Sequence, residues 1–473
     1  MNRKETMESS KVIEFRSVSE TLGKLHLGKK KVLIPEMNRI AAHLISAAFR
    51  SFGINAQVLK TYEGLDLGKK YTSGKECYPC QVTLGDILCF AKEERERLGQ
   101  AFSAEDYIYF MPESEGPCRF GLYNKYQRIV LDSFPGLQKL KITSMTTKDG
   151  YSVAGLLEKE KVLGFKKAGF LSLVVADILD RLTWRVRPYE KEQGMTDAFI
   201  EQAMQRMADS FETYGAGNSF DPVLTELDGI LEEANEIMDP RISPKPLVGI
   251  VGEIFLRMHR DSNQDLIRVL EKYGAEVENA SMSEWVNYVS YAGLRQAKKR
   301  LALNLRLLRL PQIKTCAKEI LDFGMNLLFQ ETTQKAVYRR AQKISDLAGD
   351  HKISNLEKTL NRSGIFSFDV STEACLSIAG ILHCAREGYN GVVNVYPFTC
   401  MPSITTSAIV RPLMNERQFP YLDTPYDGSL QPNREASLRT FMYQAQQHFM
   451  QHGRKTAGNH DAKSRKDWKQ RVI

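Results

Sequence analysis

Apolar and polar positions near the start of the chain predict a strand–helix–strand unit. Residues 30–37 (KKVLIPEM) are a short apolar run interrupted by Pro35, which is typical of a buried strand. Residues 38–52 space their apolar side chains as an amphipathic helix does, and Gly53 follows as a stop. Residues 54–59 are apolar again, so the three segments form a βαβ unit, the building block of a parallel sheet.

A second unit of the same kind is expected in the later half of the chain. Residues 245–255 (KPLVGIVGEIF) restart the strand pattern, and residues 274–280 (GAEVENA) supply the next strand after a helix. Two further buried strands are predicted, at residues 106–112 and 391–398. We therefore expect an α/β protein with two Rossmann-like parallel-sheet domains, helical additions and a cleft between the domains, where ligands sit at the carboxyl ends of the strands.

Composition and periodicity predict the domain organisation. A basic amphipathic stretch at residues 290–310 has two interpretations, a solvated surface helix or a helix that meets a membrane or a partner. The expected order is a polar N-terminal arm (1–29), a first α/β domain (30–150), a helical connecting region (151–240), a second α/β domain (241–450) with a helical insertion near 284–350, and a basic disordered tail (451–473).

The net charge is concentrated at the C-terminus. The whole chain carries +8, and the segment from Arg454 onward has seven Lys or Arg and two Asp, which gives +5. No basic patch lies on a recognisable nucleic-acid module, so no nucleic-acid partner is expected. No run reaches the about 18 apolar residues of a membrane helix, and the first residues lack a secretory apolar segment. The expected location is the cytoplasm, with no membrane partner.

Eight cysteines in a reducing compartment indicate metal or redox chemistry rather than disulfides. Loops containing glycine and proline carry four of them: Cys77 and Cys80 share one loop, and Cys118 and Cys400 each follow a predicted strand. If both sheets open toward one cleft, these loops converge there. Thiolates suit zinc, copper(I) or iron–sulfur sites, so these four cysteines are the candidate metal ligands. No catalytic residue is assigned.

The other four cysteines mainly predict packing. Cys89, Cys316 and Cys375 lie on predicted helices, where core positions are expected. Cys384, near the end of a helix, fits either core packing or an additional ligand role. Arg119, beside Cys118, is either a donor to the sulfur atoms of a cluster or an ordinary structural arginine.

Two short motifs raise alternatives. Residues 23–30 (GKLHLGKK) nearly match a P-loop, but Lys30 stands where Ser or Thr is needed and the motif precedes its strand. No ATP site is therefore expected in this chain. The Cys-Tyr-Pro-Cys segment at residues 77–80 resembles a redox dithiol before a helix, so a thiol–disulfide enzyme is an alternative function. That alternative leaves Cys118 and Cys400 without a role.

Four motifs resemble, in their order along the chain, the 2-hydroxyacyl-CoA dehydratase superfamily. They are KECYPCQVTLGDIL, FMPESEGPCRFGLYNKYQRIVL, PLVGIVGEIFLR and GYNGVVNVYPFTCMPS. The chain looks closest to the dehydratase-like part of the large acyl-CoA dehydratase activase-related proteins. It is also similar to the branch that includes the double-cubane iron–sulfur reductases. The resemblance extends from about Lys30 to about Met450.

This resemblance implies an iron–sulfur cofactor. Proteins of the family hold a [4Fe–4S] cluster through three cysteines and leave one iron open, or they hold a linked double-cubane cluster. Cys77, Cys118 and Cys400 match the ligand motifs. Cys80 stands where simple dehydratase subunits need no cysteine and would serve an extra cluster.

The resemblance also implies anaerobic, low-potential one-electron reduction or dehydration of an acyl-CoA or another small molecule. The electron would come from a separate ATP-dependent activase with its own iron–sulfur cluster, because this chain lacks the activase domains. Related subunits in the family imply a homo- or heterodimer. The alternative from a different class is a non-catalytic scaffold or regulatory partner of an activase.

Overall fold

The computed structural model describes residues 30–114, 116–143 and 157–454. The predicted N-terminal arm, nearly all of the P-loop-like segment and most of the predicted basic tail lie outside these residues. Within them, no helix is long and apolar enough to cross a membrane.

The first sheet has four parallel strands in the order β2-β1-β3-β4. Buried Val32 and Leu33 in β1 lie between β2 and β3, which explains why this apolar run is continuous rather than alternating. The elements are β1 (Lys31–Ile34), α2 (Arg39–Ser51), β2 (Ala56–Val58), α3 (Leu65–Lys70), α4 (Tyr78–Leu98), β3 (Tyr107–Phe110), α5 (Tyr123–Asp132) and β4 (Lys141–Thr143).

The second sheet repeats the plan, with four parallel strands in the order β6-β5-β7-β8. The predicted α/β class with two Rossmann-like parallel sheets is thus confirmed. Its elements are β5 (Leu247–Gly252), α9 (Ile254–Met258), α10 (Leu266–Lys272), β6 (Glu276–Asn279), α14 (Glu373–Arg386), β7 (Gly391–Pro397), α15 (Met401–Glu416), β8 (Tyr421–Tyr426) and α16 (Arg434–His452).

Two strands escaped the sequence analysis, and both lie at a sheet edge. Strand β4 has only three residues, and its sequence KIT includes an exposed lysine. Strand β8 (YLDTPY) is mostly half-buried and contains a proline, which an edge strand tolerates. Edge strands lack the continuous apolar run that reveals a central parallel strand.

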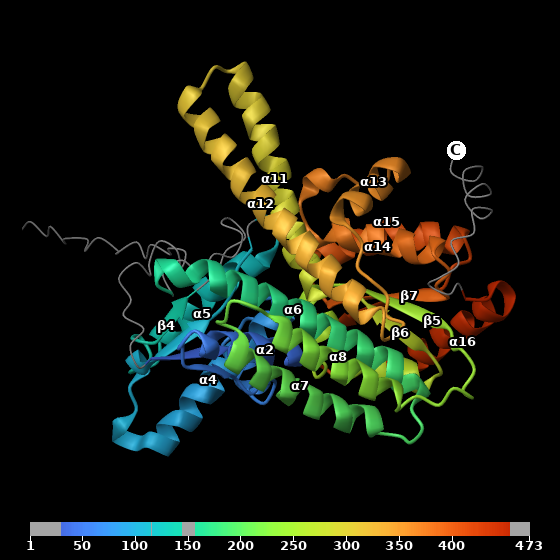
Figure 1. Ribbon diagram of the computed structural model, residues 1–473, viewed down its shortest axis with the longest axis horizontal. Coiled ribbons are helices and arrows are strands. Elements are labelled where there is room, and N and C mark those ends of the chain that lie inside the picture. Colours follow the sequence, from blue (N-terminus) through green and yellow to red (C-terminus); the bar gives the residue numbers. More distant parts are fainter. Residues whose placement is uncertain (1–29, 115, 144–156, 455–473) are drawn as a thin grey trace, which may run out of the picture.

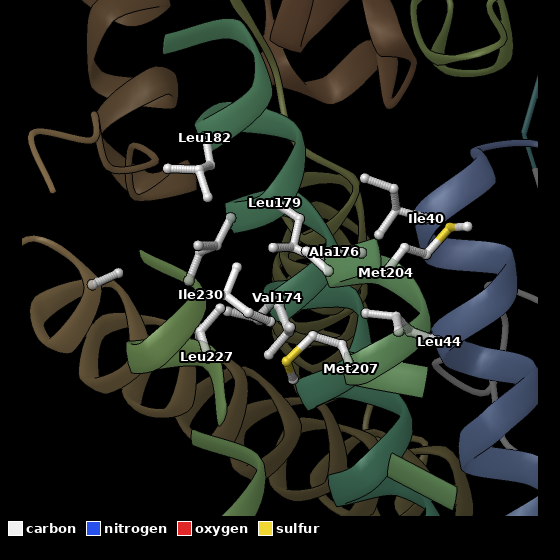
Figure 2. Close-up of a cluster of buried hydrophobic side chains, with 14 of the residues drawn as sticks. Ile40, Leu44, Val174, Ala176, Leu179, Leu182, Met204, Met207, Leu227 and Ile230 are labelled. Carbon is white, nitrogen blue, oxygen red and sulfur yellow. The ribbon is translucent and has the colours of Figure 1, made fainter. Parts of the chain in front are cut away.

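The helical region between the sheets is a core layer and not merely a connection. Helices α6 (Lys159–Val186), α7 (Met195–Tyr214) and α8 (Asp221–Asn235) pack together and against α2 of the first sheet. Figure 2 shows Ile40 and Leu44 of α2 facing apolar side chains of these three helices. The same cluster includes Val337 of α12, so both halves of the chain contribute to it.

A helical hairpin projects from the body (yellow in Figure 1). It consists of α11 (Met282–Arg306) and α12 (Leu310–Ala341), and α13 (Ile353–Ser363) follows. Asp177 of α6 anchors its base by accepting from the backbone N–H groups of Met282 at 2.8 Å and Ser283 at 2.9 Å. Ser281 caps the helix by accepting from Glu284 N–H at 3.0 Å. Three of the first N–H groups of α11 are therefore satisfied.

The Asp177 anchor should make stability depend on pH. Burial raises the pKa of Asp177 to about 7, with a further rise from Asp350. The folded chain then holds a proton that the unfolded chain releases, so the free energy of unfolding falls as pH rises from about 4 to about 7. In Asp177→Asn this fall should shrink by on the order of 3 kcal/mol. Urea unfolding at both pH values measures the change in the free energy of unfolding. The control is Asp209→Asn at an exposed position, which should show the same pH dependence as the wild type.

The close packing of α4 against α3 should not tolerate a methyl group added at Gly85. A Cβ at Gly85 would lie 2.1 Å from the carbonyl oxygen of Gly64, so the helices would have to separate. We expect Gly85→Ala to cost about 1–3 kcal/mol in urea unfolding. The control is Gly324→Ala, because a Cβ there meets nothing within 4 Å and should stabilise α12 by up to about 1 kcal/mol. Equal stability of the two variants would contradict this account.

Candidate functional site

The candidate residues lie where ligands are expected in open parallel sheets. Cys118 lies in the segment after β3, while Glu253 and Cys400 come soon after β5 and β7. In both sheets the strand order reverses between the neighbours β1 and β3 or β5 and β7. The crevice beside the carboxyl ends at such a reversal is the usual binding position.

Each of the three motif cysteines stands directly before a helical segment. Cys77 is the N-cap of α4, Cys400 is the N-cap of α15, and Cys118 precedes the 3₁₀ turn that continues into α5. None of the three thiols is used to cap its own helix. In α4 and α15 the second helical residue is proline, Pro79 or Pro402, whose missing N–H costs no intrahelical bond there. The partial positive charge at these helical N-termini therefore favours an anionic group, such as a thiolate, beside each cysteine.

Arg119 joins the three cysteine segments. Its Nη1 donates to the carbonyl oxygen of Lys75 at 2.6 Å, two residues before Cys77. Its Nη2 donates to both the carbonyl oxygen and the hydroxyl of Thr399 at 2.7 Å, one residue before Cys400. Since Arg119 itself follows Cys118, one guanidinium group connects all three segments. Of the two roles considered for Arg119, these contacts are those of a structural arginine, and its hydrogen bond to the Cys77 thiol also fits a donor to sulfur.

The three thiols and two glutamates act on one another electrostatically. Burial raises the pKa of the Cys118 thiol to about 12, and Glu373, Glu253 and Cys77 add to the rise. Burial also raises the pKa of Cys400, again with contributions from Glu373 and Glu253. The pKa of Cys77 is raised by burial, while hydrogen bonds from Tyr123 and Arg119 oppose the rise.

Glu253 and Glu373 were not singled out from the sequence. Glu253 caps α9 by accepting from the N–H groups of Phe255 at 3.1 Å and Leu256 at 2.9 Å. Glu373 accepts from Ile254 N–H at 3.1 Å, so both carboxyl groups bind N–H groups in the first turn of α9. Burial and the neighbouring Glu253 raise the pKa of Glu373 to about 8. The available signal was a glutamate immediately after the buried β5 run.

We had expected Cys80 to lie on a loop, but it does not. It occupies the first turn of α4 and is packed in the core of the first sheet. Burial raises its pKa, and Cys77, Glu76 and Arg119 are the charged groups that act on it. The helix begins at Tyr78, earlier than the apolar pattern indicated, because Cys77 supplies the extended N-cap residue.

The remaining cysteines divide into packed and partly exposed positions. Cys316 and Cys375 are buried, as expected. Cys384 packs under β5, where its sulfur lies 2.7 Å from the position of a Cβ at Gly249, so core packing accounts for it. The core expectation for Cys89 was wrong: this thiol is partly exposed and lies 3.6 Å from Glu93.

Two hollows adjoin the cysteine segments. An open one of about 610 Å³ is lined by Cys118 and Arg119, with Lys125 and Glu113 at its wall. A second cavity of about 240 Å³ lies between α2, α6 and the α11–α12 hairpin and is almost wholly apolar. Phe120 and Ile254 line the apolar cavity, and they come two residues after Cys118 and one residue after Glu253.

The three motif cysteines provide soft donors for a metal site. Within the described residues, no group of three or more His, Cys, Asp or Glu side chains is placed to hold a metal ion. Cys77, Cys118 and Cys400 are soft, largely buried donors without disulfide partners, and this chemistry fits an iron–sulfur cluster.

Removing the guanidinium of Arg119 should loosen all three cysteine segments. Hydrogen bonds from a charged donor contribute about 1.5–3 kcal/mol. We therefore expect amide exchange near Lys75 and Thr399 to rise at least about tenfold in Arg119→Ala, measured by hydrogen–deuterium exchange. Arg97→Ala is the control, because Arg97 pairs with Glu94 at the end of α4 opposite to Cys77. Unchanged exchange in Arg119→Ala would refute the bridging role.

Comparison with known proteins does not assign a family. No protein-family model matches the chain, and no curated protein matches it. The family resemblance of the four motifs therefore stays an expectation from the sequence.

Proposed function

We propose that this chain is an iron–sulfur protein of the 2-hydroxyacyl-CoA dehydratase type. In this proposal Cys77, Cys118 and Cys400 bind a [4Fe–4S] cluster, and the chain catalyses low-potential one-electron reduction or dehydration of an acyl-CoA or another small molecule. A separate ATP-dependent activase with its own cluster supplies the electron. The single observation that carries the proposal is that Arg119 ties together three buried or half-buried thiols at helix N-termini from both sheets.

A bound cluster would supply single electrons and, at an open iron, a Lewis acid for a substrate oxygen. The residues of the chain would hold the cluster and adjust its charge and potential. The starts of α4, α15 and the segment after Cys118 favour the negative charge of thiolate ligands. Tyr123 and Arg119 donate hydrogen bonds to the sulfur of Cys77, and such bonds to sulfur raise a cluster potential.

Glu373 is the residue suited to hold a proton in the site. Burial and the neighbouring Glu253 raise its pKa, which favours the protonated carboxyl group. Ile254 N–H donates to one carboxyl oxygen, which leaves the other oxygen to carry the proton. A dehydration needs a proton for the departing hydroxyl group, and this carboxyl group lies close enough to Cys118 and Cys400 to shift their pKa values.

The cavities indicate how substrate and partner reach the site. The aromatic walls of the apolar cavity include Phe49, Phe110 and Phe170, which favour an apolar acyl or aromatic group. The open hollow beside Cys118 carries Lys125 and Arg119 on its wall, and it leaves that side of the site accessible. An apolar substrate group in the cavity and an electron donor at the open hollow would use different sides of the site, so they would not compete for space.

The electrostatics disfavour the thiol–disulfide alternative. A catalytic thiol needs a lowered pKa, because the thiolate is the nucleophile. Burial raises the pKa values of Cys77 and Cys80, and both side chains are packed in an apolar core. A metal removes this obstacle, because a coordinating thiol is deprotonated by the bound cation. The alternative of a non-catalytic scaffold stays open. The response of the cluster to reductants distinguishes it from the catalytic proposal.

The first test is cluster content after strictly anaerobic purification and reconstitution. About four irons and four sulfides per chain, with a broad visible absorbance that bleaches on reduction, are expected for one cubane. About eight irons would indicate the double-cubane form and a role for Cys80. Cys118→Ala should lose at least half of the iron, because one of three ligands is missing.

The matched control is Cys89→Ala, since Cys89 lies on α4 twelve residues after Cys77 and its thiol faces Glu93. This variant should keep full iron and sulfide. Full retention of iron in Cys118→Ala, or the absence of iron from the reconstituted wild type, would overturn the proposal. A cluster that no reductant or ligand alters would favour the scaffold.

A further inference from the structure

The turn between α11 and α12 is rich in exposed leucine. It lies at the outer end of the hairpin, where the hairpin projects from the body (Figure 1). Five of the eight residues from 303 to 310 are leucines. We call these five residues the leucine tip: Leu303 is 56% exposed, Leu305 52%, Leu307 49%, Leu308 82% and Leu310 69%. Contiguous exposed apolar surface of this kind marks an interaction site.

Leu308 ends α11 in a backbone conformation that favours glycine. Its φ angle is +50°, in the left-handed region. The N–H of Arg309 donates to the carbonyl oxygen of Asn304 at 3.0 Å, and the N–H of Leu308 donates to that of Leu305 at 3.3 Å. These two hydrogen bonds form a Schellman motif, in which the left-handed position is usually glycine because a side chain strains it. The leucine is strained and exposed to water, so stability of the hairpin in solution does not explain it.

The charged residues around the leucine tip are all basic. Residues 285–318 contain eight Lys or Arg and no Asp or Glu. Three of the eight, nearer the body, pair with acidic residues outside this segment. In the part of the chain that the structure describes, exposed Arg306, Arg309 and Lys314 have no ion-pair partner. These three cations beside the leucines can therefore bind an anionic surface.

We propose that the leucine tip docks on an anionic lipid membrane, with its leucines at the boundary of headgroups and acyl chains and Arg306, Arg309 and Lys314 on lipid phosphates. Leucine beside Lys and Arg is the composition of segments that lie in the membrane interface. A protein partner fits less well, because hot spots of protein interfaces favour Trp, Tyr and Arg, while leucine is under-represented there. The projection of the hairpin lets the tip reach a flat surface ahead of the body (Figure 1).

This proposal favours one of the two interpretations of the basic stretch at residues 290–310. A contact of this kind involves one surface of the bilayer and needs no helix that crosses it. It therefore differs from the expectation from the sequence that the chain has no membrane partner. The contact does not depend on the proposed cluster, because the leucine tip shares no residue with the cysteine segments.

Flotation of the full-length protein with lipid vesicles tests the contact. Vesicles of phosphatidylserine and phosphatidylcholine in equal amounts should bind the wild type, and pure phosphatidylcholine should bind it at least about tenfold more weakly. Leu308→Ser and Leu310→Ser should each weaken binding to the anionic vesicles about tenfold, because each removes an apolar side chain from the interface. Leu430→Ser is the control and should bind as the wild type does, since Leu430 is 88% exposed on a loop outside the hairpin.

Leu308→Gly separates docking from folding. Glycine relieves the left-handed strain, so the melting temperature of this variant should not fall, while its binding to the anionic vesicles should weaken about tenfold. A wild type that does not bind these vesicles, or binding that all three leucine-tip variants leave unchanged, would overturn the proposal. So would a wild type that self-associates through the leucine tip in light scattering and ignores the vesicles, which would assign the tip to a second copy of the chain.

Discussion

The arrangement of the site depends on one guanidinium group. Arg119 donates to Lys75 and Thr399, which lie on segments far apart in the sequence, and it follows Cys118 directly. Each of the three cysteines begins a separate helical segment. By donating to carbonyl oxygens just before Cys77 and Cys400, Arg119 holds the starts of those two segments beside Cys118. The donor fork of arginine satisfies two backbone carbonyl groups at once, which a lysine ammonium does not match in geometry.

Burial then determines the chemistry that this arrangement supports. The thiols and Glu373 all have raised pKa values, so these four groups favour their uncharged forms at neutral pH. Such a site is a poor nucleophile but a suitable receptor for a cationic metal centre, which converts thiols into thiolates. The same burial that weakens thiol–disulfide chemistry therefore strengthens the proposal of a cluster.

The two sheets keep their relative position through a shared helical core. Ile40 and Leu44 of the first α/β unit, Leu179 of α6 and Val337 of the hairpin belong to one apolar cluster (Figure 2). Because helices from both halves contribute, neither sheet can shift without exposing apolar surface. The hairpin that leaves this core is held at its base by Asp177.

The sequence by itself determined the local elements and the fold class. Continuous apolar runs at β1, β5 and β7 identify buried parallel strands, because both faces of such strands are covered. Loops after strands identified Cys118 and Cys400 as candidates. Edge strands β4 and β8, the early start of α4 and the partial exposure of Cys89 were missed, since each depends on neighbours that local periodicity does not reveal.

Only the tertiary structure decided which residues meet. The bridge from Arg119 to Thr399 spans 280 positions, and the grouping of Glu253 with Glu373 spans 120. No pattern of period 2 or 3.6 carries information over such separations, because these periods describe one strand or one helix face. The sequence therefore specified the chemical groups and their local geometry, while the packing of the two sheets on a common helical core brought them to one place.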